Sequence, residues 1–308
     1  MKKIFLFGLA LLLAIAMQAQ AQEKTADEMA RELANPIAMQ AQAQEKTADE
    51  VAKELANPNN SLASLTFKNQ FRWYTGDLPN ADDQQNYTLL FQPVFPVTMK
   101  APSEDGKANL FIRPAFPFVF DQPTFDAEKL DFKGVSAMGD IGFDIGYGVT
   151  EPSGMLWALG MVGTLPTATD SDVAGEQLRL GPEGLIAKFY PWGLWGIFPY
   201  HQWDVTGWSD SDFNTTQIQA VLKFLPGQGW SFGTSPIMAY DWVHEAWTVP
   251  VNLTASKTVM LGRMPLKIEL EGNYYVERPD AFGPEWMFGL SLTPVVPNVI
   301  EKWIRGEG

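Results

Sequence analysis

The side chains most often used in catalysis and metal binding are scarce in this sequence. Its only histidines are His201 and His244, and it contains no cysteine. No serine accompanies His201 in its predicted strand, which disfavours a site in which a serine nucleophile is activated by histidine. His244 lies with Asp241 and Glu245 in a predicted loop, where a solvated loop is the simpler interpretation than metal ligation. We therefore predict no enzyme activity, no metal site and no cofactor.

A larger set of charged residues recurs on the polar sides of predicted strands. The set comprises Lys68, Arg72, Arg113, Asp140, Asp144, Lys223, Lys257, Lys267, Glu269 and Glu271. On the inner face of a membrane barrel these residues would form a charged lumen that selects solutes by size and sign. The alternative is an occluded barrel whose interior charges pair and fill the space. The acidic members outnumber the nearby cations on their two strands, which would favour cations or neutral solutes.

Composition narrows the class of protein. The chain has 308 residues, of which 46% are hydrophobic and 13% aromatic, enough for one large domain or two small ones. Its formal net charge of −14 argues against nucleic-acid binding, which draws on a surplus of Lys and Arg. The lack of cysteine excludes disulfides and thiolate metal sites, and it suits a protein that crosses an oxidising periplasm.

The first residues have the pattern of an export signal. Met1-Lys2-Lys3 is basic, Ile4–Met17 is an apolar run, and Ala19-Gln20-Ala21 supplies a small-x-small cleavage site. A membrane anchor helix is the alternative, but the apolar run is short for a span. We predict a signal peptide over residues 1–21, cleaved between Ala21 and Gln22.

A duplicated segment follows. Ile15–Pro36 is repeated almost letter for letter in Ile37–Pro58. Two copies are too few for a solenoid, which needs at least about three repeats. Each copy contains a short helix candidate with a capping box, formed by Thr47 and Glu50 in the second copy, and an Asn-Pro pair that would end the helix. We interpret residues 22–58 as a duplicated periplasmic leader segment with short helices.

The rest of the chain alternates polar and apolar residues with a period of two. Leu65–Trp73, Asp140–Val149 and Leu266–Val276 each present one apolar and one polar face as strands. Tryptophans fall near the predicted strand ends, as in the aromatic girdles of membrane barrels. Roughly 250 residues follow Pro58 and divide into about 12 units of about 20 residues, longer than the spacing of sandwich strands. We predict an all-β fold over residues 59–308, a transmembrane antiparallel up-and-down β-barrel of about 12 strands.

The connections and prolines support this topology. Short connections such as Thr150–Gly154 and Tyr190–Gly193 alternate with long ones such as Asp121–Met138, as periplasmic turns alternate with outer loops. Proline cannot donate to a sheet ladder. The proline-rich segments Gln92–Val97 and Arg113–Phe118 are therefore predicted to lie in neighbouring strands, at the membrane rims or at bulges.

Several short motifs together resemble one bacterial family. They are Leu165–Asp170 (LPTATD), Leu180-Gly181-Pro182, Gln202-Trp203, Gly229-Trp230 with Thr234-Ser235-Pro236, Asp241-Trp242, Trp247–Pro250 with Lys257, and Tyr274–Asp280 (YYVERPD). In these motifs, from about Leu55 to Pro297, the chain resembles the MetA-pathway of phenol degradation family, often mislabelled neuromedin U in bacterial genomes. The resemblance implies an outer-membrane barrel with a transport role and no defined substrate. The chain departs from the family pattern at two points. Asn252 stands where the family pattern has Gly, and the chain continues past Pro297 into VIEKWIRGEG.

These patterns predict a channel or transporter of the cell outer membrane for small molecules, aromatic or hydrophobic ones among them. Its expected partners are outer-membrane lipid and lipopolysaccharide, the barrel-assembly machinery and a small-molecule solute. A lipid-acting outer-membrane barrel enzyme and a structural or surface-interaction barrel are the alternatives. Pore conductance would separate the first class from the other two, and lipid hydrolysis would identify the enzyme.

Overall fold

The computed structural model describes residues 46–209 and 211–306. The predicted signal peptide, its cleavage site and residues 22–45 of the leader lie outside this part of the chain, so export and cleavage stay predictions. The described elements are α4 (Ala48–Ala56), β1 (Ala63–Thr75), η1 (Ala81–Asp83), β2 (Gln85–Val94), β3 (Val97–Met99), β4 (Lys107–Asp126), β5 (Asp131–Met138), β6 (Ile141–Thr150), β7 (Met155–Leu165), η2 (Ser171–Val173), β8 (Gln177–Tyr190), β9 (Gly193–Gly207), β10 (Asn214–Gly227), β11 (Trp230–Thr234), β12 (Ile237–Asp241), β13 (Ala246–Leu261), β14 (Met264–Glu277), β15 (Gly283–Val296) and α5 (Val299–Arg305).

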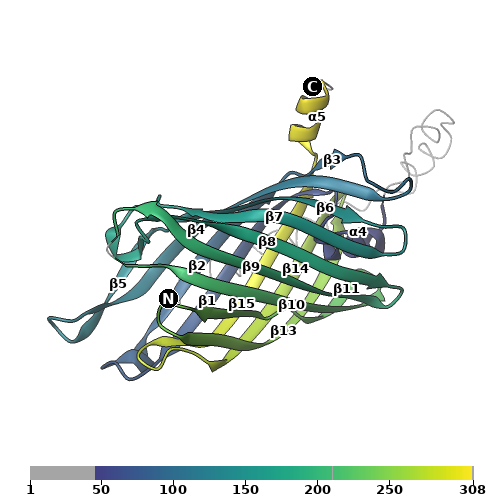
Figure 1. Cartoon of the computed structure of the whole chain (residues 1–308). Coiled ribbons are helices and arrows are strands. Elements are labelled where there is room, and N and C mark those ends of the chain that lie inside the picture. The colour runs from purple at the N-terminus through teal and green to yellow at the C-terminus, as the bar shows by residue number, and fades with distance from the viewer. Residues whose placement is uncertain (1–45, 210, 307–308) are drawn as a thin grey trace.

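The strands close into a single barrel (Figure 1). Neighbours in sequence pair antiparallel around the wall, and β15 pairs with β1 to close it. β2 and β3 form one barrel strand, as do β5 with β6 and β11 with β12, so the wall has 12 strands. The prediction of an antiparallel up-and-down barrel of about 12 strands is confirmed.

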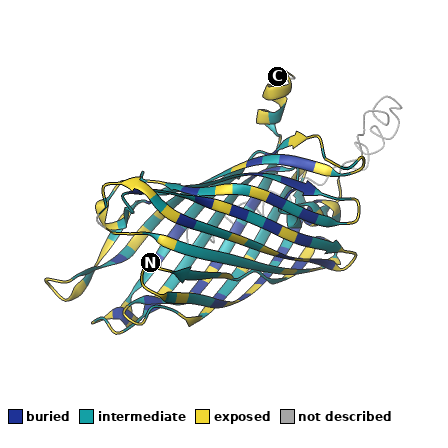
Figure 2. Cartoon of the chain, viewed as in Figure 1, coloured by how far each residue is buried: buried dark blue, intermediate teal, exposed yellow. Residues whose placement is uncertain are grey.

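The outer surface of the barrel is apolar. Of the 11 tryptophans in the chain, ten are exposed, the reverse of what an apolar core would require. Exposed and less exposed residues alternate along the strands, as Figure 2 shows. On β6 and its neighbours, Ile145 pairs with the exposed side chains of Ile112 and Met161, while Asp144 lies on the opposite face. The apolar face of these strands is therefore the outer one, as the alternation predicts.

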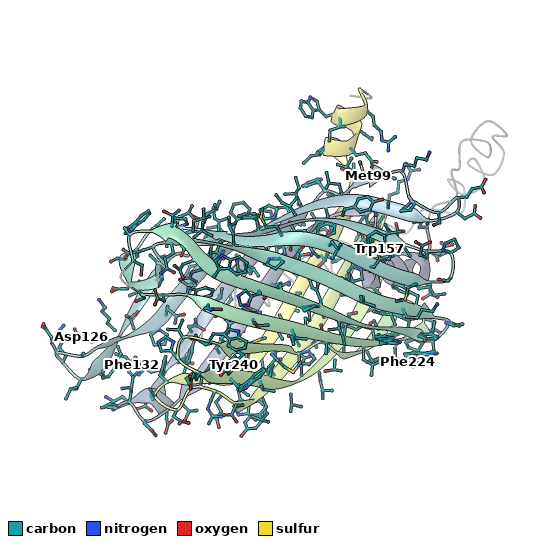
Figure 3. All side chains as sticks on the ribbon, in the orientation of Figure 1. Met99, Asp126, Phe132, Trp157, Phe224 and Tyr240 are labelled. Carbon is teal, nitrogen blue, oxygen red and sulfur yellow. The ribbon has the colours of Figure 1, made fainter. Side chains whose placement is uncertain are left out.

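The connections differ between the two ends of the barrel. Short turns join β6 to β7, β8 to β9, β10 to β11 and β13 to β14 at the end where β1 begins. The opposite end carries most of the longer connections, although residues 100–106, between β3 and β4, form a longer connection at the short-turn end. The predicted loop Asp121–Met138 is largely wrong, because β4 and β5 continue as a paired hairpin beyond the barrel wall (Figure 1). In Figure 3, Trp157 and Phe224 lie towards the short-turn end, and Asp126 and Phe132 lie towards the long-loop end.

The proline-rich segments have different outcomes. Phe95 and Pro96 separate β2, which ends at Val94, from β3, which begins at Val97. Pro114 and Pro117 instead lie within β4, in the middle of a strand. The prediction of neighbouring strands is confirmed by the pairing of β2 with β4. The ladder is also irregular at Pro117: Ala115 pairs with Gly142 and Phe118 with Met138, so two residues of β4 lie opposite three of the strand formed by β5 and β6.

Among the residues that the structure describes, two short α-helices flank the barrel. α4 begins with the predicted capping box, because Thr47 accepts from the Glu50 amide and Glu50 accepts from the Thr47 amide. α5 follows β15 and projects from the wall (Figure 1). Within residues 46–209 and 211–306, no helix combines the length and apolarity needed to cross a membrane.

Candidate functional site

The inner face of the barrel carries two charged clusters, and the first lies on β4, β6 and β8. Arg113 Nε donates to Asp144 Oδ1 at 2.7 Å, and both side chains are largely buried. The register places Arg113 opposite Asp144 on neighbouring strands, which is why the two predicted lumen residues meet. Their pairing neutralises charge that would otherwise be costly to bury.

Glu183 belongs to the same cluster and was missed by sequence reasoning. Only 6% of the residue is exposed, and its Oε1 accepts no hydrogen bond in the part of the chain described. It faces Gly160 across the β7–β8 pair, and a Cβ built on Gly160 would lie 2.6 Å from Glu183 Oε1. Glycine at position 160 therefore leaves the space that this carboxylate occupies. The flanking sequence Gly181-Pro182 and Gly184 interrupts the alternation that would have identified Glu183.

The second cluster lies on β10, β13 and β14. Glu269 accepts from Lys267 at 2.9 Å and from Lys223 at 3.4 Å. Lys223 also donates to Thr254, on the inner face of β13. Lys68 lies in the same cross-strand row as Glu269, because both pair with Ser291. Four of the predicted lumen residues thus come together on one side of the interior.

The remaining predicted residues of the inner face take part in polar networks. Glu271 Oε1 accepts from Asn252 Nδ2 at 2.9 Å and from Asn273 Nδ2 at 3.0 Å. Asn252 is buried, and its carboxamide oxygen accepts from the Ser235 amide at 2.6 Å, where β11 gives way to β12. Asparagine at this position, where the resemblance predicts glycine, therefore supplies a buried polar contact that glycine could not. Arg72 donates to Gln70 at 2.7 Å.

An apolar cluster adjoins the Arg113 cluster on the inner face. It consists of Phe111, Leu156, Ala158, Leu185 and Ala187, with Phe189 and Phe198 packed against it. The Arg113 guanidinium lies 4.6 Å from the centroid of the Phe111 ring and 5.7 Å from that of Phe198. The interior of the barrel therefore combines aromatic rings with charge, a combination that can bind amphipathic molecules.

α4 lies at the short-turn end of the barrel (Figure 1). Asp49 accepts from the Gly229 amide in the β10–β11 turn, and Val51 is 1% exposed. The backbone N–H groups of Gly229 and Gln228 lower the pKa of Asp49 below its ordinary value, because they stabilise the carboxylate. The helix therefore docks against the β10–β11 side of the mouth.

The segment that follows α4 reaches the other side of the mouth. Asn59 donates to Thr150 at the end of β6, at 3.1 Å. Asn109, on β4, donates to the Asn59 carbonyl at 2.9 Å. Because α4 docks on β10 and β11 and Asn59 docks on β4 and β6, the segment crosses the barrel end. Sequence reasoning predicted the helix but not this placement.

Two predicted lumen residues are placed elsewhere. Asp140 precedes β6 and accepts from the amides of Thr167, Ala168 and Gly175 at 2.7–2.9 Å, so it organises the β7–β8 loop. Lys257 lies on the outer face, because the register pairs it with the exposed Trp230, and its Nζ is 4.8 Å from that ring. Its neighbours Ser256 and Thr258 take the buried positions on β13. Both predictions are wrong. Asp140 lies just before β6 and not within the strand, and Lys257 lies on the opposite face of β13 from the predicted one.

The histidines do not form a site of the serine–histidine type. His201 Nδ1 lies 2.8 Å from Thr216 Oγ1, and its ring contacts Trp203 on the outer face. His244 Nδ1 lies 2.8 Å from Asp241 Oδ2 in an exposed loop. In residues 46–209 and 211–306, no three His, Asp or Glu side chains are grouped to hold a metal ion.

Comparison with known proteins identifies the fold. No family model and no curated protein sequence matches the chain. An outer membrane channel from Pseudomonas putida F1 superposes with a TM-score of 0.57 at 14% identity, covering 76% of this chain and 96% of that one. The NanC porin superposes with a TM-score of 0.45 at 10% identity, covering 75% of this chain and 98% of the porin. Outer membrane phospholipase A from Escherichia coli superposes with a TM-score of 0.40 at 10% identity, covering 82% of this chain and 98% of the phospholipase. The fold is that of an outer-membrane barrel, while membership of the MetA-pathway family stays a prediction.

Proposed function

We propose that the protein is an outer-membrane channel for small organic solutes, with aromatic or hydrophobic molecules that are cationic or neutral as its preferred class. The observation that carries the proposal is Glu183, a buried inner-face carboxylate with one oxygen unpartnered. No group of the described residues donates to this oxygen, and an unpartnered buried polar group is costly, so the carboxylate is available to a partner from the lumen. A solute that donates a hydrogen bond or carries positive charge would satisfy it.

The surroundings of Glu183 define the solute class. The aromatic rings of Phe111 and Phe198 lie beside the Arg113 guanidinium, which is itself paired with Asp144. The rings offer an apolar surface to a hydrophobic or aromatic body, and Glu183 offers a partner for its polar end. The paired charges contribute little net attraction for an anion.

The exposed apolar surface supports placement in the outer membrane. The apolar outer face and the exposed tryptophans would be costly in water and are favourable in lipid. Export by the predicted signal peptide, contact with lipopolysaccharide and insertion by the barrel-assembly machinery belong to the same proposal.

α4 makes the proposed passage a gated one. The helix and the segment after it cross the barrel end, docked through Asp49, Val51 and Asn59. A solute that leaves through this end must pass beside α4 or displace it. We therefore expect low basal conductance that increases when α4 is released.

Uptake by liposomes tests the proposal. Protein reconstituted in liposomes should take up benzylammonium faster than benzoate, which has a similar size and opposite charge. Glu183→Gln should lower that preference several-fold, because the amide lacks the charge. Glu128→Gln, which changes an exposed carboxylate of the β4–β5 hairpin, should leave the preference unchanged. Uptake no faster than in protein-free liposomes, both for the unmodified chain and for Val51→Asp, which releases α4, would contradict the channel. An unchanged preference in Glu183→Gln would contradict the role of Glu183.

A further inference from the structure

α5 is attached to the barrel by its polar side. Asn298 caps the helix and donates to the Pro96 carbonyl at 2.6 Å. Glu301 accepts from the Thr98 amide at 3.1 Å, and Arg305 donates to the Thr98 carbonyl at 3.4 Å. Arg305 also donates to Glu301 at 3.0 Å. The charged face of α5 is therefore turned towards β3 and fixes the helix to the wall.

The apolar face of α5 is exposed in the part of the chain described. At about 100° per residue, Val299, Ile300, Trp303 and Ile304 share one side of the helix, opposite Glu301 and Arg305. All four are exposed, Trp303 at 78% and Ile304 at 54%. A helix in water normally turns its apolar face to the protein and its charged face to solvent, so this orientation indicates an apolar surrounding.

The position of α5 identifies that surrounding. β15 ends at the short-turn end of the barrel, where Trp157, Trp192, Trp195 and Trp230 lie beside the turns. Figure 1 shows α5 projecting sideways from the wall beside β3, and Figure 3 shows the exposed Met99 below it. The exposed face of α5 thus continues the tryptophan-bearing outer surface instead of facing the barrel interior.

We propose that α5 is an interfacial anchor whose apolar face binds the phospholipid leaflet around the short-turn end of the barrel. Trp303 and Ile304 insert at the boundary of headgroups and acyl chains, as in amphipathic helices that lie in a membrane interface. Lys302, which is exposed, reaches the anionic headgroups. The inference rests on the proposed membrane placement and adds a lipid-binding element beyond the strands.

The chain has no cysteine, so a single label can report on each face of the helix. Ile304→Cys and, as a matched control, Lys302→Cys are labelled with the environment-sensitive fluorophore NBD. Each full-length variant is folded into vesicles of phosphatidylethanolamine and phosphatidylglycerol. We expect blue-shifted emission at position 304, with strong quenching by lipids that carry a spin label high on the acyl chain. At position 302 we expect red-shifted emission and quenching by aqueous iodide.

Separate results would overturn the proposal. Equal, water-like emission at both positions would show that α5 stands in solvent. A blue shift at position 304 that resists spin-labelled lipid and grows with the protein-to-lipid ratio would indicate a second copy of the chain as the occupant. Heat-modifiable gel mobility and solute uptake in the same vesicles report barrel insertion and channel function, so failure of the anchor is distinguishable from failure of the proposed function.

Discussion

Releasing α4 tests whether this helix controls the barrel end. Val51 is the most buried side chain of α4, and Val51→Asp replaces its apolar contact with a carboxylate. Burying a valine side chain contributes about 1.5–3 kcal/mol. Loss of that contribution shifts the docking equilibrium about 10- to 150-fold towards the released helix, since each 1.4 kcal/mol is about tenfold. The desolvation of the new carboxylate adds to this effect.

Single-channel recording in planar bilayers measures the consequence. Val51→Asp should raise the mean conductance or open probability over the unmodified chain. The control is Lys53→Gln, a change to an exposed position on the same helix, which should leave the conductance unchanged. If Val51→Asp gives normal heat-modifiable mobility and an unchanged conductance, docking of α4 does not limit passage and the gating argument fails.

The remaining predictions concern facing, pH and the duplication. Ile145→Arg should lower the free energy of unfolding by roughly 2–4 kcal/mol in lipid, measured by urea titration, because it places a cation on the lipid-facing wall; an effect as small as that of Ile145→Ala would contradict the facing. Asp144→Arg should also be destabilising, since it opposes Arg113, so Asp144→Asn is the better probe of lumen charge. Docking lowers the pKa of Asp49 from its ordinary value of 3.8, so the carboxylate contributes fully to docking above pH 3.8 and loses this contribution as pH falls through the lowered pKa. Conductance should therefore rise on acidification below about pH 3.8, and Asp49→Asn should remove that pH-dependent step. Deleting Ile37–Pro58 should leave outer-membrane abundance unchanged, because the first copy supplies the same helix sequence with only conservative changes, and N-terminal sequencing of the mature chain should begin at Gln22.

The sequence predicts the wall of the barrel well because burial on one face imposes a period of two. Asp144 and Ile145 alternate as expected, and Glu269 and Glu271 share the inner face with Lys267. The alternation assigned Lys257 to the wrong face of β13, because the residues around it are small or polar and give no strongly apolar face. The period-two rule assigns a face only where one side is clearly apolar.

Pairing and docking were beyond sequence reasoning for a different reason. That Arg113 meets Asp144 depends on the register between β4 and β6, which no single strand encodes. The location of α4 likewise depends on contacts between Asp49 and a turn 180 residues away in sequence. Glu183 was hidden by a glycine and a proline beside it, although its position opposite Gly160 is what gives it space. These features follow from long-range geometry and needed the folded structure.

Accessibility of position 183 tests the central claim most directly. Because the chain has no cysteine, Glu183→Cys can be modified selectively with a positively charged methanethiosulfonate reagent during current recording in a planar bilayer. The matched control is Leu159→Cys, which places the thiol on the outer wall where Leu159 is 69% exposed. The proposed channel predicts that the current through Glu183→Cys changes on modification and that the current through Leu159→Cys does not. A conducting Glu183→Cys barrel whose current is indifferent to the reagent would show that solutes do not pass this residue.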